Sequence, residues 1–296
     1  MEIDHLPVLP DEVLSYLTVP EGKARMLDCT TGEGGHTALF LERYKELTVT
    51  GLDRDREIQK KAIERLAPYG DRFQSVNCWF TDYLAGCESG SFDCILFDLG
   101  ISMFHYVESG RGFSFSKDEP LDMRLDTQNG LSAADIVNGY SEQELADVIY
   151  RYGEERYSRR IARRICEERS KGEITTSSQL AGIIAQAVPA SYRYGRINPA
   201  TRTFQALRIE VNDELGHLEP ALRDAVRALR KGGRLGVITF HSLEDRIVKW
   251  FFKGEADKED PVIRILTKKP VMPSEEECAA NNASRSSKLR VVEKVR

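Results

Sequence analysis

The chain of 296 residues lacks the features that mark membrane, secreted and metal-binding proteins. No apolar run approaches the length of a membrane-spanning helix, and residues 1–4 lack the basic and then apolar pattern of a secretory signal peptide. The six cysteines include no Cys-x-x-Cys pair, and the five histidines show no metal-ligand spacing. We therefore expect reduced thiols, no bound metal, no contact with a membrane and a cytoplasmic location.

A glycine is also missing from a turn that otherwise has the pattern of a nucleotide-binding motif. Residues 28–36 read Asp-Cys-Thr-Thr-Gly-Glu-Gly-Gly-His, between an apolar run and a helical pattern. This order of strand, glycine turn and helix opens nucleotide-binding α/β units. The dinucleotide fingerprint needs a further glycine where this chain has Thr37, so the turn favours a ligand without a pyrophosphate, and S-adenosylmethionine fits. Asp53 ends the next apolar run, where such folds place a carboxylate against ribose hydroxyls.

The charge of the chain gives no simple indication of a partner. A net charge of −5 argues against nucleic acid, although the distribution of charge matters more than its sum. Arginines cluster in residues 156–164 and again in residues 285–290. Because glutamates flank the first cluster, composition alone favours a solvated helix face there.

The first third of the chain alternates strands and helices. The candidate strands are residues 24–28, 48–53, 73–76 and 93–99. Such alternation predicts a parallel sheet with its ligand beyond the carboxyl ends of the strands. Asp28, Asp53, Phe80 and Asp98 lie at or just past these ends, so we expect them to converge on one crevice.

The pattern becomes helical over residues 132–188, which indicates an inserted helical domain. Capping boxes at 141–144 and 176–179 precede two of its helices. The α/β pattern then resumes, with a helix ended by Gly232-Gly233 and an apolar strand at 235–240. A further helix is capped at Ser242. Residues 262–266 and 289–292 are expected to pair as an antiparallel hairpin around a loosely structured segment at 272–284.

Asp98 is the candidate for chemistry, because it ends the fourth strand in the run Phe-Asp-Leu-Gly-Ile-Ser. With the Ser102 hydroxyl it could hold an exocyclic amine in line with a methyl donor. Asp98 could instead hold the α-ammonium of the cofactor, or cap a turn. No cysteine lies in this turn, which disfavours methylation of cytosine carbon C5, and His241 after the next strand is more typical of a structural donor than of a base.

Motifs along almost the whole chain resemble those of the MraW/RsmH family, the bacterial small-subunit ribosomal RNA cytosine-N4 methyltransferases. They are residues 5–9, 34–36, 52–55, 97–100, 111–115, 120–124, 152–156, 199–208, 240–246 and 285–290. The resemblance implies an α/β fold with a seven-stranded Rossmann-like methyltransferase sheet and an inserted all-helical domain. We expect a first sheet part at 1–104, the helical domain at 105–198 and a second sheet part at 199–296.

The resemblance also implies an activity: S-adenosyl-L-methionine-dependent methylation of N4 of a cytosine in the decoding region. The cofactor contacts that it implies are Gly34, Gly35, His36, Asp53, Phe80 and Asp98. Phe80 would pack on the adenine, and Asp53 would bind the ribose hydroxyls. Family members usually continue Ser-Pro-Gln after this turn, whereas this chain has Met103-Phe104-His105, so His105 takes the place of a cofactor-binding glutamine.

The partner that the resemblance implies is small-subunit ribosomal RNA, free or in the assembled subunit. Under this interpretation the arginine-rich helix and family-like loops contact RNA, through Arg111, Arg124, Arg159, Arg163, Arg202 and Arg208. The oligomeric state is open, and a homodimer is one of the states considered. The alternatives are a methyltransferase for another amine, a ribosome-assembly factor that binds the cofactor only structurally, and a nicotinamide-dependent oxidoreductase.

Overall fold

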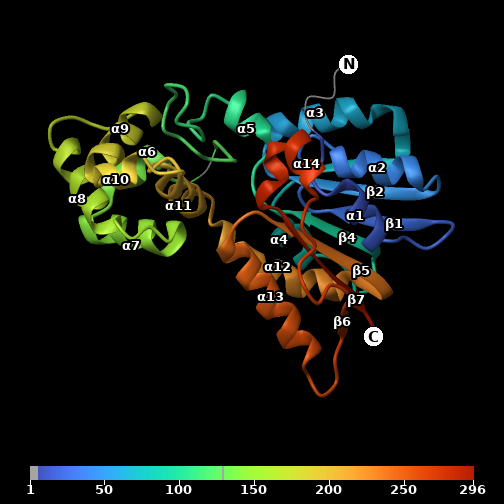
Figure 1. The fold of residues 1–296 in the computed structure, drawn as a ribbon. Coiled ribbons are helices and arrows are strands. Elements are labelled where there is room, and N and C mark those ends of the chain that lie inside the picture. The colour runs from blue at the N-terminus through green and yellow to red at the C-terminus, as the bar shows by residue number, and fades with distance from the viewer. Residues whose placement is uncertain (1–5, 129) are drawn as a thin grey trace. The chain divides into compact units, whose positions relative to one another are not determined.

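A mixed seven-stranded sheet forms the centre of one part of the chain, with the strand order β3-β2-β1-β4-β5-β7-β6 (Figure 1). Strands β1 to β5 are parallel, β7 runs antiparallel to β5, and β6 runs antiparallel to β7. This confirms the expected methyltransferase-type sheet with its terminal antiparallel pair. The strands are β1 (Ala24–Asp28), β2 (Leu47–Asp53), β3 (Phe73–Asn77), β4 (Phe92–Asp98), β5 (Leu229–Thr239), β6 (Ile263–Ile265) and β7 (Lys288–Lys294).

The computed structural model describes residues 6–128 and 130–296, which divide into two compact units. The sheet unit runs up to Ser102 and resumes at Leu215, and the helical unit is Met103–Glu214. Residues 1–5 lie outside the described residues. They include the first position of the motif at 5–9 and the segment in which no signal peptide is expected. The helices of the sheet unit are α1 (Pro10–Tyr16), α2 (Gly35–Arg43), α3 (Arg56–Leu66), α4 (Phe80–Ala85), α12 (Glu214–Ala228), α13 (Ser242–Ala256) and α14 (Glu275–Ala280), with 3-10 turns η1 (Ala67–Arg72) and η2 (Asn282–Ser286).

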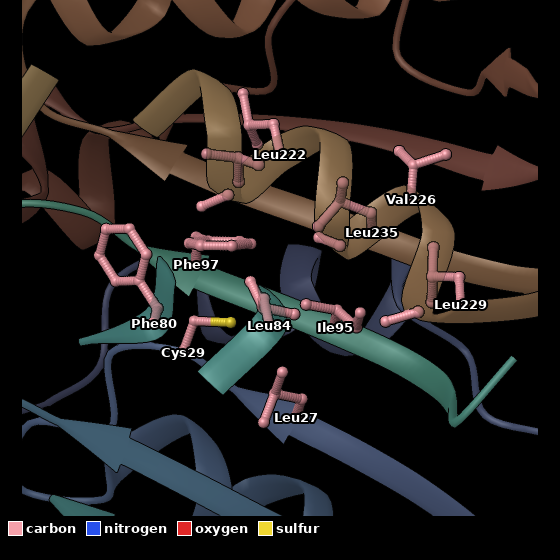
Figure 2. Close-up of a cluster of buried hydrophobic side chains, with 14 of the residues drawn as sticks. Leu27, Cys29, Phe80, Leu84, Ile95, Phe97, Leu222, Val226, Leu229 and Leu235 are labelled. Carbon is pink, nitrogen blue, oxygen red and sulfur yellow. The ribbon is translucent and has the colours of Figure 1, made fainter. Parts of the chain in front are cut away.

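The core of the sheet unit follows from the alternation of side chains along parallel strands. On one face, Leu27, Ile95 and Leu235 pack beneath Leu84 of α4 and Leu222 of α12 (Figure 2). All five side chains are fully buried, which is why these strands read as near-continuous apolar runs. The opposite face packs against α1 and α2, with Met26, Leu96, Ile238, Val13 and Phe40 in one cluster.

The helical unit lies in the chain where the insertion is expected, between the two parts of the sheet unit. Both predicted capping boxes are present, with Ser141 capping α7 and Thr176 capping α9, and a third at Ser132 caps α6. Its helices are α5 (Met103–Val107), α6 (Ala133–Gly139), α7 (Glu142–Gly153), α8 (Ser158–Arg169), α9 (Ser177–Ala187), α10 (Ala190–Arg193) and α11 (Thr201–Asn212). Among all the described helices, none combines the length and apolar character needed to cross a bilayer.

The second boundary of the helical unit falls later than the expected position after residue 198. Helix α11 belongs to the helical unit because it packs closely on α7. A Cβ atom at Gly153 would lie 2.6 Å from the Arg202 carbonyl oxygen, so glycine allows this approach of the two backbones. Whether the two units fold independently stays a prediction.

Three local expectations for the last third of the chain are wrong. Helix α12 ends at Ala228 and β5 already begins at Leu229, so the pair Gly232-Gly233 lies in the irregular first part of the strand. There Gly232 adopts φ +82°, and a Cβ at Gly233 would lie 2.9 Å from a backbone oxygen. The segment at 272–284, expected to be loose, contains α14, capped by Ser274 and carrying three glutamates in its first turn.

The third correction concerns the start of α13. His241, and not Ser242, is the capping residue, and its Nδ1 accepts a hydrogen bond from the Glu244 N–H at 3.5 Å. The Glu244 carboxylate accepts in return from the His241 N–H at 3.3 Å. The contacts of His241 are structural, but its ring accepts a hydrogen bond in this cap, whereas a structural donor was expected.

Candidate cofactor site and arginine-rich surface

Three carboxylates lie at the carboxyl ends of neighbouring parallel strands. Asp28 ends β1, Asp53 ends β2 and Asp98 ends β4. Phe80 opens α4 directly after β3. Because β2, β1 and β4 are adjacent in the sheet, these strand ends lie along one edge, where the alternation of strands and helices predicts a ligand.

Asp53 fixes the glycine turn that follows β1. Its Oδ2 accepts from the Gly32 N–H at 2.9 Å, and its Oδ1 accepts from the Asp55 N–H at 2.8 Å. A carboxylate oxygen can accept more than one hydrogen bond, so holding the turn does not exclude hydroxyls of a ligand. Asp53 therefore shapes the turn and can also bind a ligand beside it.

Gly34 must be glycine for reasons of backbone angle and of space. It adopts φ +81° at the N-cap of α2, and a Cβ there would lie 2.8 Å from Leu66 Cδ1. Its N–H donates to the Thr31 carbonyl at 2.8 Å, which closes the turn. Gly35 follows as the first residue of α2, with Pro7 in van der Waals reach of a Cβ.

Thr37, the residue that replaces the further glycine of the dinucleotide fingerprint, has its own structural role. Its hydroxyl donates to Asp28 Oδ2 at 2.7 Å. Burial raises the pKa of Asp28, and the hydrogen bond from Thr37 partly counters this. Asp28 also accepts from the Thr30 N–H, and the Thr30 hydroxyl accepts from the Asp98 N–H at 2.7 Å. In the sequence alone, Thr37 stands out only as a missing glycine.

His36 connects the N-terminal segment to Asp98. Its Nε2 lies 2.8 Å from the Val8 carbonyl oxygen, and its Nδ1 lies 3.4 Å from Asp98 Oδ2. A carbonyl only accepts, so Nε2 carries a proton, and a carboxylate beside Nδ1 favours a second proton there. Burial lowers the pKa of His36. The hydrogen bond and charge of Asp98, together with the charge of Asp28, raise the pKa by more than burial lowers it, so the net shift is upward.

The other oxygen of Asp98 is the clearest sign of a ligand. Asp98 Oδ1 is buried and has no hydrogen-bond partner among the residues that the structure describes. A buried carboxylate oxygen without a partner is costly, so a cationic or N–H donor from a ligand would satisfy it. The acceptor oxygens of Asp98 and Asp53 therefore fit a cofactor that carries both an ammonium group and ribose hydroxyls.

Phe80 belongs largely to the core. Its side chain is 8% exposed and meets Phe97 edge-on at 5.4 Å between ring centroids (Figure 2). Trp79 beside it stacks on His217 at 4.4 Å and lies under the Arg54 guanidinium at 4.6 Å. The predicted contact of Phe80 with adenine involves only the small exposed part of its ring and stays a prediction.

The cysteines near this edge are poorly suited to nucleophilic attack. Cys29 and Cys94 are buried, and burial raises the pKa of both thiols well above the usual value. The thiolate is the reactive form, so neither residue is an activated nucleophile. This agrees with the expectation that carbon C5 of cytosine is not the acceptor.

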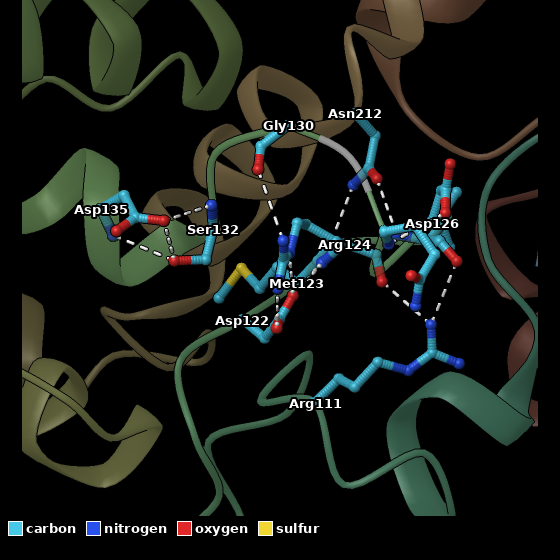
Figure 3. A network of polar contacts seen from close by, with 11 residues as sticks. Arg111, Asp122, Met123, Arg124, Asp126, Gly130, Ser132, Asp135 and Asn212 are labelled. Atoms are coloured by element: carbon cyan, nitrogen blue, oxygen red, sulfur yellow. Dashed lines mark hydrogen bonds and ion pairs between the residues drawn. The ribbon is translucent and has the colours of Figure 1, made fainter.

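Two arginines predicted to contact RNA are held inside the helical unit. Arg111 donates to the carbonyl oxygens of Arg124 and Leu125, at 2.9 and 3.2 Å (Figure 3). Arg124 donates two hydrogen bonds of 2.8 Å to the Asp122 carboxylate. Burial raises the pKa of Asp122, but the contacts with Arg124 lower it more. These contacts stabilise the loop before α6, and an RNA contact by either arginine stays a prediction.

Three further predicted residues also have internal partners in the helical unit. Arg208 forms a two-pronged ion pair with Glu214, at 2.8 and 2.9 Å. His105 is buried and meets Phe113 edge-on at 5.3 Å. Arg202 donates to the Glu154 carbonyl oxygen at 3.3 Å. No contact here tests their roles toward RNA or cofactor, and these roles stay predictions.

The arginine-rich segment forms a surface of a different kind. A hollow of about 490 Å³ is lined by Arg156, Tyr157, Arg159, Arg160 and Tyr150, with Ala146, Asp147 and Ser158. Arg159, Arg160 and Tyr150 are exposed. Arg156 is exposed as well, and its guanidinium lies 4.8 and 5.1 Å from the ring centroids of Tyr157 and Tyr192. Arg163 is exposed further along α8, 3.5 Å from Glu142. Exposed arginine and tyrosine around a hollow suit phosphate and base contacts better than a plain solvated helix face.

Comparison with known proteins identifies the family. Residues 2–295 match the model described as the MraW methylase family. The chain belongs to the MraW methylase family. A relative from Treponema denticola named ribosomal RNA small subunit methyltransferase H is 50% identical, over 100% of this chain and 98% of its own. A Nostoc protein of the same name is 48% identical, over 98% of this chain and 92% of its own.

Solved structures resemble the MraW-family chain more distantly. A crystal structure described as an rRNA methylase from Streptococcus thermophilus aligns with a TM-score of 0.45 at 11% identity. It covers 97% of this chain and 93% of that one. The family assignment depends on the sequence matches and not on this likeness.

Proposed function

We propose that this MraW-family protein transfers the methyl group of S-adenosyl-L-methionine to the exocyclic N4 of a cytosine in the decoding region of small-subunit ribosomal RNA. The match of almost the whole chain to the family, with relatives named ribosomal RNA small subunit methyltransferase H, carries the proposal. The partnerless oxygen of Asp98 beside the glycine turn supports it from the structure. We propose that the protein acts in the cytoplasm, on free RNA or on the subunit.

The residues of the sheet edge divide the work of binding. Gly34, Gly35 and His36 form the turn that the cofactor would contact, and Asp53 would accept from the ribose hydroxyls. Asp98 would use its Oδ1 for the α-ammonium or for the target amine. The first role is electrostatically simpler, since the buried Oδ1 has no hydrogen-bond partner among the described residues and can accept from a cation.

The chemistry needs alignment more than it needs a base. The cofactor supplies a methyl carbon bonded to a positively charged sulfur, open to attack in line. Transfer to the amine would form a nitrogen–carbon bond in place of the carbon–sulfur bond, and the amine proton would pass to solvent water. Alignment of two reactants can supply about 7–11 kcal/mol of the barrier, so positioning residues such as Asp98 account for the catalytic need.

Calorimetry with substitutions of Asp98 tests the cofactor half of this proposal. We expect the wild-type protein to bind S-adenosylmethionine and not NAD. Asp98→Ala should weaken the binding about tenfold or more, because the substitution removes the carboxylate whose buried Oδ1 would face the cationic group of the cofactor. Binding of NAD instead would contradict the proposal in favour of the oxidoreductase. Unchanged affinity in Asp98→Ala, with turnover abolished, would reassign Asp98 to the amine.

For the RNA half, we propose that the arginine hollow and Arg163 contact phosphates. Arg159→Ala with Arg163→Ala should weaken the binding of a decoding-region RNA and lower the salt slope by about 0.7 for each single-strand phosphate that is no longer neutralised. Lys45→Ala with Lys60→Ala removes two exposed positive charges from the sheet unit and is the matched control. An unchanged salt slope in the arginine variant would return α8 to a solvated helix face.

A further inference from the structure

Helix α13 carries an exposed tryptophan that the proposed function does not use. Phe252, two residues further along the helix, is buried, whereas the Trp250 side chain is 57% exposed. The chain contains only two tryptophans, and this one leaves a large part of its aromatic surface uncovered on the helix. This exposure calls for a ligand that covers the ring.

Two lysines flank the exposed ring. The Nζ atoms of Lys249 and Lys253 each lie 5.4 Å from the centroid of the Trp250 ring. Within the described ranges, neither lysine pairs with a carboxylate. Arg246 is exposed one turn earlier on the same helix. The face therefore offers an aromatic ring with cations beside it, which is the pattern of single-stranded nucleic-acid binding surfaces.

A groove borders this face on the side of α12. Its volume is about 460 Å³, and Trp250 and Arg246 line it together with Arg223 and the acids Glu219 and Glu255, and with Ile247, Phe251 and Gly254. Glu219 lies 3.5 Å from Arg223, and Glu255 lies 2.6 Å from Lys258. Because both acids have basic partners, the lysines determine the charge that faces an incoming ligand.

We propose that this α13 face binds an unpaired nucleotide of the RNA substrate. A base stacks on the Trp250 ring, and Lys249 and Lys253 contact the phosphates on either side. The proposal rests on the proposed function, since it assigns a second binding surface to the same RNA partner. A protein partner would be better matched by an apolar border, whereas this ring is bordered by cations that complement phosphate.

The test is fluorescence anisotropy with a labelled single-stranded RNA of decoding-region sequence. Trp250→Ala should weaken binding about tenfold, and Trp250→Phe should restore most of the affinity because a flat ring remains. Lys249→Gln with Lys253→Gln should lower the salt slope by about 0.7 for each phosphate that is no longer neutralised. Lys268→Gln with Lys269→Gln removes two other exposed lysines of the sheet unit. This control should change the RNA affinity only by the small effect of the altered net charge.

The outcomes separate this inference from the proposed function. S-adenosylmethionine binding, measured on the same samples, should be equal in all variants. If the wild-type protein bound no RNA, both the proposed function and this inference would fail. If it bound RNA but Trp250→Ala bound equally well, only the stacking site would be overturned. Equal RNA affinity with weaker binding to assembled subunits would replace it with a protein contact.

Discussion

The pairing of His36 with Asp98 predicts a specific dependence of stability on pH. The pKa of His36 is raised above its ordinary value of 6.5. A group with a raised folded pKa stabilises the protein fully below its unfolded pKa, and this contribution is lost as the pH rises through the folded pKa. The stabilisation by His36 should therefore be complete below pH 6.5 and decline above it.

The magnitude follows from the contacts that His36→Gln would change. Glutamine can still donate to the Val8 carbonyl, but it cannot carry the charge that faces Asp98. A hydrogen bond to a charged group contributes about 1.5–3 kcal/mol, and the His36–Asp98 contact is long, so we expect about 1.5 kcal/mol. Urea unfolding should therefore show wild type more stable than His36→Gln by that amount near pH 6, with the difference shrinking toward pH 9.

A second background makes this reasoning refutable. In Asp98→Asn the carboxylate that raises the pKa of His36 most is gone, while burial still lowers that pKa, so the His36→Gln difference should no longer shrink toward high pH. A difference between wild type and His36→Gln that stays constant with pH would show that His36 does not gain a second proton beside Asp98. If the stability difference between wild type and His36→Gln grew with pH, the pKa of His36 would be lowered in the folded protein, which would refute the proposed pairing with Asp98.

Two further predictions concern the sheet unit. Gly51→Ala places a Cβ 2.5 Å from Thr31 Oγ1 and 2.7 Å from Phe73 Cε2. We therefore expect the free energy of unfolding, measured with urea, to fall by about 1–3 kcal/mol. An unchanged urea midpoint would contradict this prediction. Asp245 is partly buried, which raises its pKa, but the Arg290 guanidinium at 2.7 Å lowers it more, so its contribution is present above pH 3.8 and lost as the pH falls through the lowered value. Asp245→Asn should cost about 2 kcal/mol at neutral pH, and this cost should narrow in acid; a cost independent of pH would argue against the ion pair.

Much of the sheet could be predicted because its strands are buried on both faces. The expected strand 24–28 coincides with β1, and the ends of β2, β3 and β4 differ from expectation by at most one residue. Asp53 and Asp98 could be placed at one edge because parallel strands align their carboxyl ends. Local signals also sufficed for the caps of α7 and α9, where Ser141 and Thr176 hydrogen-bond within one turn.

The parts that could not be predicted depend on contacts distant in sequence. Nothing local to His36 indicates that the Val8 carbonyl lies 2.8 Å away, or that Trp79 stacks on His217. The first part of β5 reads as the end of a helix because glycine usually ends one, whereas the partner strand β4 draws this segment into the sheet. Helix α14 does have a local signal, because Ser274 precedes three glutamates as a helix cap would. The expectation of a loose segment overlooks this signal.

Nucleoside mass spectrometry of small ribosomal subunits that lack the modification, after incubation with this protein and S-adenosylmethionine, tests the central claim most directly. The account predicts new N4-methylcytidine, dependent on the cofactor and mapping to the decoding region. No new methylated nucleoside, with cofactor binding intact, would contradict it in favour of an assembly factor. A methyl group on another base or atom would contradict the proposed acceptor.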